Sequence, residues 1–127
     1  MKIESKSKNA SFEILPVEKD KNAVCFYLKA INSSFTGELS EIWIDKNNIS
    51  KFCNEIDELL SKGIDRVLLT AYSDFNMEIT RTDNLGHVKL KVVLENLVLE
   101  SNLTLTIESD FSYLSLLSDF FKRELVD

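Results

Sequence analysis

The stretch Phe75–Glu95, FNMEITRTDNLGHVKLKVVLE, contains the clearest strand-pairing signal in the chain. If Asp83–Gly86 forms a four-residue turn, residues whose numbers sum to 169 lie opposite each other in two antiparallel strands. This register pairs Phe75 with Leu94, Met77 with Val92 and Ile79 with Leu90 on one face, and Glu78 with Lys91 and Thr80 with Lys89 on the other. A slip of one residue would move every apolar side chain to the wrong face. The stretch therefore predicts an antiparallel hairpin with one buried face.

Further extended segments lie on both sides of this hairpin. Alternating or strand-like composition predicts strands over residues 11–19, 22–32, 34–45, 65–73 and 102–109. Pro16 indicates an edge or a bulge, since proline cannot donate a backbone hydrogen bond within a sheet. The apolar phase changes between Leu39 and Ile42, which a bulge would explain. Residues 1–10 are polar, and we expect them to be ragged.

Two helices complete the predicted pattern. Residues 47–63 place apolar side chains at helical spacing, and Gly63 stands where a left-handed C-terminal residue is expected. A second helix follows Ser109 or Asp110, either of which can cap it. The predicted order is β-β-β-α-β-β-β-β-α. We therefore expect one α+β domain over residues 1–127, with a mostly antiparallel sheet of about six or seven strands and both helices packed on one face.

The composition limits the partners that the chain can bind. It has 15 Lys and Arg against 21 Asp and Glu, a net charge of −6 with pI ≈ 4.8, which disfavours nucleic acid and anionic membranes. Any charged partner is expected to be basic. The sequence shows no secretory signal or long apolar run, and Cys25 and Cys53 stand in apolar stretches that suit reduced, buried thiols. These features predict a cytoplasmic protein.

Motifs for catalysis or cofactor binding are not found. The sequence lacks phosphate-binding glycine loops, a G-x-S-x-G elbow and a C-x-x-C pair. A single histidine and two separated cysteines make a zinc site improbable by ligand chemistry. His87 follows the predicted turn on the polar side of its strand, so we interpret it as a surface hairpin residue rather than a general base. We expect no enzyme activity, no cofactor and no metal.

Trp43 is the strongest candidate for an interface residue. It stands between Ile42 and Ile44, so a regular strand would turn it outward between the acidic Glu41 and Asp45, whereas a bulge would turn it inward. Both alternatives are compatible with the sequence. Exposed faces and element ends give one candidate set of partner-binding residues, namely Glu41, Trp43, Asp45, Asp74, Glu78, Glu95 and Glu108.

Four segments of this chain resemble the WapI-like immunity proteins of bacterial polymorphic, contact-dependent toxin systems. They are FTGELSEIWID (35–45), ISKFCNEIDELL (49–60), TRTDNLGHVKLKVVL (80–94) and NLTLTIESDFSYLSLLSDF (102–120). The similarity is a succession of elements: a strand leading into a helix, an aspartate-and-glycine hairpin, a strand and a last capped helix.

The resemblance implies a non-enzymatic inhibitor that binds the cognate toxin domain, often a nuclease, without a cofactor. An acidic protein complements the basic cleft of a nuclease, which favours fast and selective association. Two alternatives remain open from the sequence: another acidic interaction module or adaptor, and a small enzyme with an unrecognised site. The edge near Pro16 would permit a weak homodimer, so the protein is expected to be a monomer or a weak homodimer.

Overall fold

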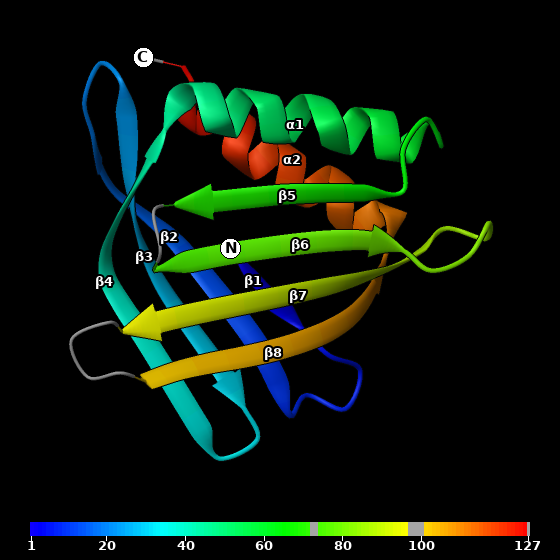
Figure 1. Ribbon diagram of the computed structural model, residues 1–127, viewed down its shortest axis with the longest axis horizontal. Helices are drawn as coiled ribbons and strands as arrows, with labels where there is room; N and C mark the ends of the chain where they lie inside the picture. The colour runs from blue at the N-terminus through cyan, green and yellow to red at the C-terminus, as the bar shows by residue number, and fades with distance from the viewer. Residues whose placement is uncertain (72–73, 97–100, 127) are drawn as a thin grey trace.

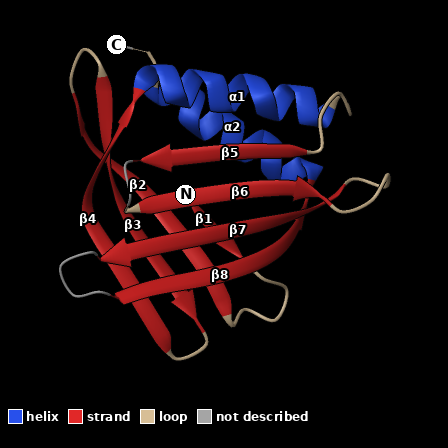
Figure 2. Cartoon of the chain, in the orientation of Figure 1, coloured by secondary structure: helices blue, strands red, loops and turns tan. Residues whose placement is uncertain are grey.

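The computed structural model describes residues 1–71, 74–96 and 101–126. It contains eight strands and two helices within these ranges (Figures 1 and 2). The elements are β1 (Lys2–Glu4), β2 (Ala10–Lys19), β3 (Ala23–Asn32), β4 (Phe35–Asp45), α1 (Lys46–Leu60), β5 (Arg66–Ala71), β6 (Phe75–Arg81), β7 (His87–Asn96), β8 (Ser101–Asp110) and α2 (Phe111–Glu124). No helix in these ranges is long and apolar enough to cross a membrane.

The strands form two four-stranded antiparallel sheets instead of the predicted single sheet. The first sheet has the order β1-β2-β3-β4 and the second β5-β6-β7-β8, so each strand pairs only with its neighbours in sequence. The two sheets face each other, and their strands cross at a large angle (Figure 1). Alternation identifies a buried face on each strand but does not reveal how many sheets share the core. The predicted ragged start was also wrong in part, because β1 pairs with β2.

The predicted hairpin register is confirmed. β6 and β7 pair Phe75 with Leu94, Met77 with Val92, Glu78 with Lys91, Ile79 with Leu90 and Thr80 with Lys89. The two predicted irregularities are present as well. The β2–β3 register shifts between Pro16 and Glu18, and the β3–β4 register shifts opposite the segment that joins Leu39 to Ile42. These shifts bend β2 and β4 around the core.

Aromatic side chains connect the two sheets and the helices in one core. The rings of Phe12 from β2 and Phe75 from β6 stack with centroids 6.1 Å apart, which joins the sheets. Phe121 of α2 packs edge-on against Phe26 of β3 at 5.6 Å and Phe52 of α1 at 5.5 Å. The helices therefore lie together over one end of the sandwich, rather than on the face of a single sheet (Figure 2).

The helix ends agree with the sequence at one helix and differ at the other. Asp110 caps α2 by accepting hydrogen bonds from the N–H groups of Ser112 at 3.0 Å and Tyr113 at 3.3 Å. After α1, the left-handed residue is Lys62, with φ 66°, and Gly63 does not adopt a positive φ. The N–H of Gly63 still closes the turn by donating to the carbonyl of Glu58 at 2.8 Å. The prediction for Gly63 was therefore wrong by one position.

Candidate functional site

Five of the seven predicted partner-binding residues belong to β4, to the start of β6 or to the end of β7. β4 passes these strand ends on one side of the molecule (Figure 1). The five are Glu41, Trp43, Asp45, Asp74 and Glu95. Asp74 and Glu95 are joined by a hydrogen bond from the Glu95 N–H to the Asp74 carbonyl at 2.8 Å. Together with Glu38, these five residues are called the acidic edge below.

Trp43 lies on the outer face of β4. Its neighbours Ile42 and Ile44 are buried in the core, so the alternation of the strand directs Trp43 outward, and it is half-buried. The alternative in which the bulge turns Trp43 inward was wrong, because the bulge ends before Ile42. The indole lines a hollow of about 150 Å³ with Ile44, Asp45, Asn48, Thr70 and Ala71. An aromatic surface therefore lies directly beside a carboxylate.

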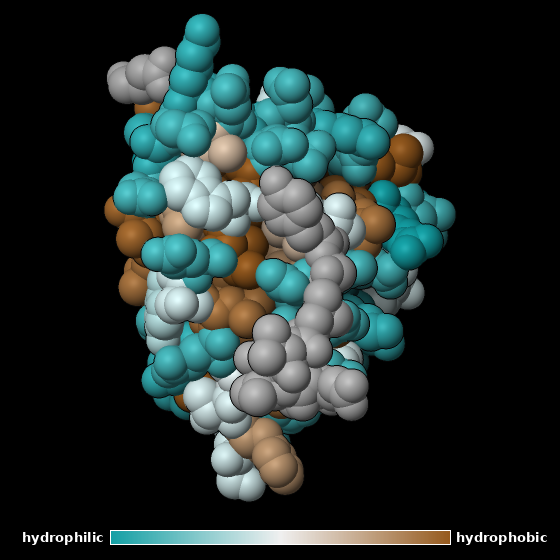
Figure 3. Space-filling view, turned by 60° about the vertical axis from the view of Figure 1, so that its left-hand side comes forward, coloured by the Kyte–Doolittle hydropathy of each residue, from teal (hydrophilic) through white to brown (hydrophobic). Residues whose placement is uncertain are grey.

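A second hollow lies further back along β4, where the sandwich is open between the sheets. It has a volume of about 290 Å³ and an apolar lining of Phe35, Leu39, Leu94 and Leu103. Glu38 and Glu95 stand at its rim, and the Phe35 side chain is 72% exposed. Figure 3, which turns this side forward, shows hydrophobic surface in the middle of the face with hydrophilic groups around it. The second hollow therefore combines an apolar floor with an acidic rim.

Four of the five carboxylates of the acidic edge have no ion pair among the residues that the structure describes. They are Glu41, Asp45, Asp74 and Glu95, whereas Glu38 pairs with the Lys29 ammonium at 3.9 Å. No Lys, Arg or His lines either hollow within the same ranges. Unpaired carboxylates of this kind create a negative potential that attracts cationic groups.

The pKa of the Cys25 thiol reflects its position on β3, the strand next to β4. Cys25 lies opposite Trp43 in the β3–β4 pair. Burial raises its pKa, and the negative charges of Glu41 and Glu18 raise it further. Cys25 and Cys53 are both buried free thiols, as the sequence predicted. Neither thiol is therefore placed to act as a surface nucleophile.

The structure places the remaining two predicted residues away from the acidic edge. Glu78 lies on the outer face of the second sheet, where its carboxylate accepts hydrogen bonds from Arg66 Nε at 3.0 Å and Nη2 at 2.5 Å. Glu108 lies opposite Lys89 in the β7–β8 pair, at the other end of those strands. The charge of Glu78 is already compensated, so it contributes little attraction for a partner.

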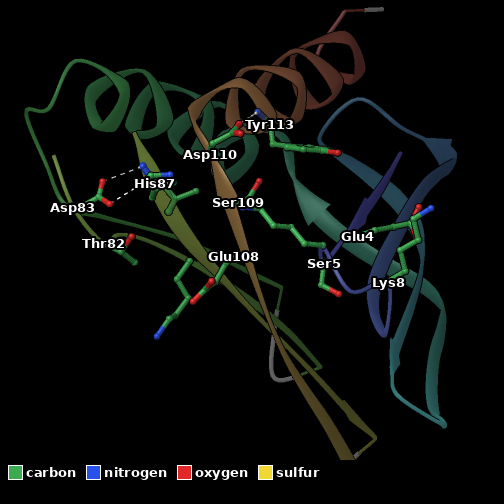
Figure 4. Close-up of a pocket in the computed structure, with 13 residues that line it drawn as sticks. Glu4, Ser5, Lys8, Thr82, Asp83, His87, Glu108, Ser109, Asp110 and Tyr113 are labelled. Atoms are coloured by element: carbon green, nitrogen blue, oxygen red, sulfur yellow. Dashed lines mark hydrogen bonds and ion pairs between the residues drawn. The ribbon is translucent and has the colours of Figure 1, made fainter. Parts of the chain in front are cut away.

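His87 lines a large pocket, which the sequence did not predict. The pocket has a volume of about 690 Å³ and lies between the β1–β2 turn and the junction of β8 with α2. Figure 4 shows Asp83 and His87 on one wall and Glu4, Ser5 and Lys8 on the opposite wall. The two walls are about eighty residues apart in the chain, so no local pattern could have joined them.

Asp83 holds the His87 ring within the turn. Its Oδ2 lies 2.7 Å from His87 Nδ1, and its Oδ1 accepts the N–H of Leu85 at 2.7 Å. The hydrogen bond from Leu85, followed by those from His87, lowers the pKa of Asp83. His87 is exposed, in agreement with its interpretation as a hairpin residue. Among the described side chains, no hydroxyl or thiol is hydrogen-bonded to its ring, so this pair lacks an attached nucleophile.

The described residues contain no group of three or more His, Cys, Asp or Glu arranged to hold a metal ion. Comparisons with protein-family models, curated proteins and solved structures found no match to this chain. The features of the molecule that bear on function are the two hollows and the large pocket.

Proposed function

We propose that this chain is a non-enzymatic binding protein whose acidic edge captures a basic protein partner. The supporting observation is the pair of hollows along β4, one bordered by Asp45 and the other by Glu38 and Glu95, and both by aromatic or aliphatic side chains. Trp43 and Phe35 supply the apolar contact area, one beside each hollow. The combination matches the composition of protein interfaces, in which a few aromatic anchors contribute most of the binding energy.

The charge of the acidic edge would act mainly on the rate of association. Unpaired carboxylates attract a basic surface over roughly 10 Å at 0.1 M salt. This attraction raises the association rate, and it weakens as the salt concentration rises. The apolar hollows would then determine how long the complex lasts, since buried aromatic contacts govern dissociation. We therefore expect changes to the carboxylates to alter mainly the association rate, and changes to the apolar side chains to alter mainly the dissociation rate.

The resemblance to immunity proteins makes a bacterial toxin domain the partner that we propose. A toxin that cleaves nucleic acid presents a basic cleft for phosphates, and the acidic edge complements such a cleft. Binding there would exclude the nucleic acid and neutralise the toxin without any chemical reaction. An adaptor that binds some other basic protein would use the same edge. The identity of the protein bound distinguishes the two possibilities.

The test is a binding measurement with the proteins encoded beside this gene, among which the proposal expects a toxin domain. We expect a 1:1 complex, rescue of growth on co-expression, and an association rate that falls as salt increases. Trp43→Ala should weaken binding by about thirtyfold, because an interface anchor contributes roughly 2 kcal/mol or more. Asp45→Lys should slow association by about tenfold with less effect on dissociation.

Glu58→Lys provides the matched control. Glu58 is an exposed carboxylate on α1, away from both hollows, and the substitution changes the net charge by the same amount. If Glu58→Lys slows association as much as Asp45→Lys, only the net charge matters and the acidic edge is not the interface. If no protein encoded nearby binds, the toxin partner is refuted.

A further inference from the structure

The free edge of β4 borders the second hollow. β4 is the last strand of the first sheet, and in the part of the chain that the structure describes it pairs only with β3 (Figure 1). Residues 35–39 of β4 all line the hollow, although consecutive side chains of a strand point to opposite faces. The hollow therefore runs along the edge of the strand, where the backbone of β4 is accessible.

The hydrogen-bonding pattern shows which backbone groups of β4 point into the hollow. The N–H of Ser33, just after β3, donates to the carbonyl of Asn9 at 2.6 Å. Odd-numbered residues of β3 therefore direct their backbone groups towards β2, and even-numbered residues towards β4. Even-numbered residues of β3 lie opposite odd-numbered residues in this part of β4. Thr36 and Glu38 thus direct their N–H and carbonyl groups away from β3.

These outward backbone groups are available for pairing. Thr36 and Glu38 are exposed, and within residues 1–71, 74–96 and 101–126 no backbone hydrogen bond reaches their outward groups. Edge strands are commonly protected by Pro or Lys, and residues 35–45 contain neither. An extended segment beside β4 could therefore use two N–H groups and two carbonyls.

The hollow combines an apolar floor with acidic groups at its rim. The floor includes Leu94 of β7 and Leu103 of β8, and Glu38 and Glu95 stand at the rim. Glu95 has no ion pair among the described residues, and Glu38 pairs with Lys29 across 3.9 Å. No described Lys, Arg or His lines the hollow. Cationic side chains at the rim and apolar side chains on the floor would complement it.

An added strand would present its side chains in this order. Glu38 lies on the outer face of the first sheet, because its register partner Lys29 alternates with the buried Leu28 and Ala30. A residue that exchanges backbone hydrogen bonds with Glu38 would point its side chain to the same outer face. Its neighbours would point to the inner face, where a Cβ at Gly37 would meet Leu103 and Leu94. The pairing residues are therefore expected to be basic and their neighbours apolar.

A second copy of this chain does not complement the edge. Pairing of β4 with β4 would bring Glu38 and Glu41 of both copies onto adjoining strands, and like charges there are destabilising. The net charge of −6 on each copy adds to the repulsion. The occupant with complementary charge is a basic segment of another protein.

We infer that the basic partner proposed above binds by adding a strand to the free edge of β4. The segment would pair through its backbone with Thr36 and Glu38. Its apolar side chains would contact Leu94 and Leu103, and its Lys or Arg side chains would lie along the rim. Backbone pairing would provide affinity, and the alternation of basic and apolar residues would provide selectivity. The inference rests on the proposed function, because it describes how the same partner occupies the second hollow.

The test uses the full-length protein and a synthetic seven-residue peptide in which four Lys alternate with three Val. In the free protein, the amides of Thr36 and Glu38 should exchange with solvent faster than those of Gly37 and Leu39, which are bonded to β3. Addition of the peptide should shift the resonances of Thr36 and Glu38 and slow their exchange.

Two methylated peptides separate backbone pairing from attraction by charge. N-methyl groups on the two central Lys residues block the hydrogen bonds to β4, so this peptide should bind about thirtyfold more weakly. N-methyl groups on two Val residues lie on the opposite edge of the peptide, and this matched control should bind like the unmodified peptide. Failure of the unmodified peptide to slow exchange at Thr36 and Glu38, or equal weakening by both methylations, would overturn the inference.

Protein variants give an independent check. Thr36→Pro removes the outward N–H and should reduce peptide binding about fivefold, whereas Thr36→Val keeps the N–H and should bind like the wild type. If Thr36→Pro does not fold, the methylated peptides still decide. A homodimer that protects the Thr36 amide without peptide would assign the edge to a second copy and refute the inference.

The inference and the proposed function can fail separately. If the peptide pairs with β4 but no protein encoded nearby binds, strand addition stands and the proposed partner is wrong. If a toxin domain binds but leaves the exchange of Thr36 and Glu38 unchanged, the proposed function stands and strand addition is wrong.

Discussion

Gly37 on β4 is the position where adding one methyl group should be most informative. A Cβ there would lie 3.0 Å from Leu103 Cδ2, 3.3 Å from Leu103 Cβ and 3.7 Å from Leu94 Cδ1. The Leu103 Cδ2 can rotate away, but its Cβ is fixed to the backbone of β8. The two sheets must therefore separate slightly at this point. Overpacking of this kind costs about 1–3 kcal/mol.

Part of this cost is offset because alanine is less flexible than glycine in a strand, by about 0.5–1 kcal/mol. From the middle of both ranges, the net loss for Gly37→Ala should be about 1.3 kcal/mol. A chain of 127 residues has an unfolding entropy of about 0.27 kcal/mol/K, on the basis of about 2.1 cal/mol/K per residue. The melting temperature should therefore fall by about 5 °C in a calorimetric scan.

Gly63→Ala is the matched control for this experiment. A Cβ at Gly63 meets the Glu58 carbonyl oxygen at 3.4 Å, an ordinary contact, and the backbone there does not have a positive φ. We expect no loss of stability or a gain of up to about 1 kcal/mol. Leu103→Ala keeps the Cβ that forces the sheets apart, so most of the penalty of Gly37→Ala should persist in the double variant. If Gly37→Ala melts at or above the wild-type temperature, β4 and β8 do not pack as closely as described.

Three other predictions concern stability and thiol reactivity. Asp110→Ala should cost about 1 kcal/mol in urea unfolding, because two N–H groups at the start of α2 lose their acceptor, whereas Asp110→Asn should retain most of the stability. Hydrogen bonds, from Ser112 at Asp110 and from Leu85 at Asp83, lower the folded pKa of both carboxyls. The two carboxyls therefore stabilise the fold above their unfolded pKa of about 3.9, and this contribution is lost as the pH falls through the folded pKa. The free energy of unfolding should differ less between pH 3 and pH 7 in the Asp83→Asn, Asp110→Asn double variant than in the wild type. Burial raises the pKa of Cys25 and Cys53, so a thiol reagent at pH 8 should modify them much more slowly in the folded protein than in urea. Fast labelling of the native protein would contradict their burial.

The elements that could be predicted from the sequence are those fixed by neighbouring residues. The β6–β7 register followed from one turn, because apolar and charged pairs agreed on the same alignment. The cap at Asp110 and the bulge at Pro16 also depend on local chemistry. Lys62 shows that local signals do not fix the exact position. The turn after α1 contains a left-handed residue, as predicted, but that residue is Lys62 and not Gly63.

Long-range arrangement was not encoded in any single segment. The division into two sheets depends on α1 carrying the chain from β4 to β5 across the sandwich, which alternation within strands does not specify. The large pocket joins Glu4 to Glu108, two exposed residues from opposite ends of the chain. The acidic edge was partly foreseen, since Trp43 and Asp45 are close in sequence. The second hollow was not predicted, because its lining combines Leu39 of β4 with Leu103 of β8, which are far apart in the sequence.

The neighbour-only pairing of the strands also affects how the chain can assemble during synthesis. All hydrogen bonds of the first sheet lie within residues that leave the ribosome before β5 is made. Hairpins with short loops form quickly, so this sheet can assemble early. Its inner face, which includes Phe12 and Phe26, then has no cover until β6 and α2 arrive. If the ribosome pauses after α1 has emerged, the first sheet would expose its apolar inner face to solvent. We expect chaperones to bind the nascent chain mainly at this stage.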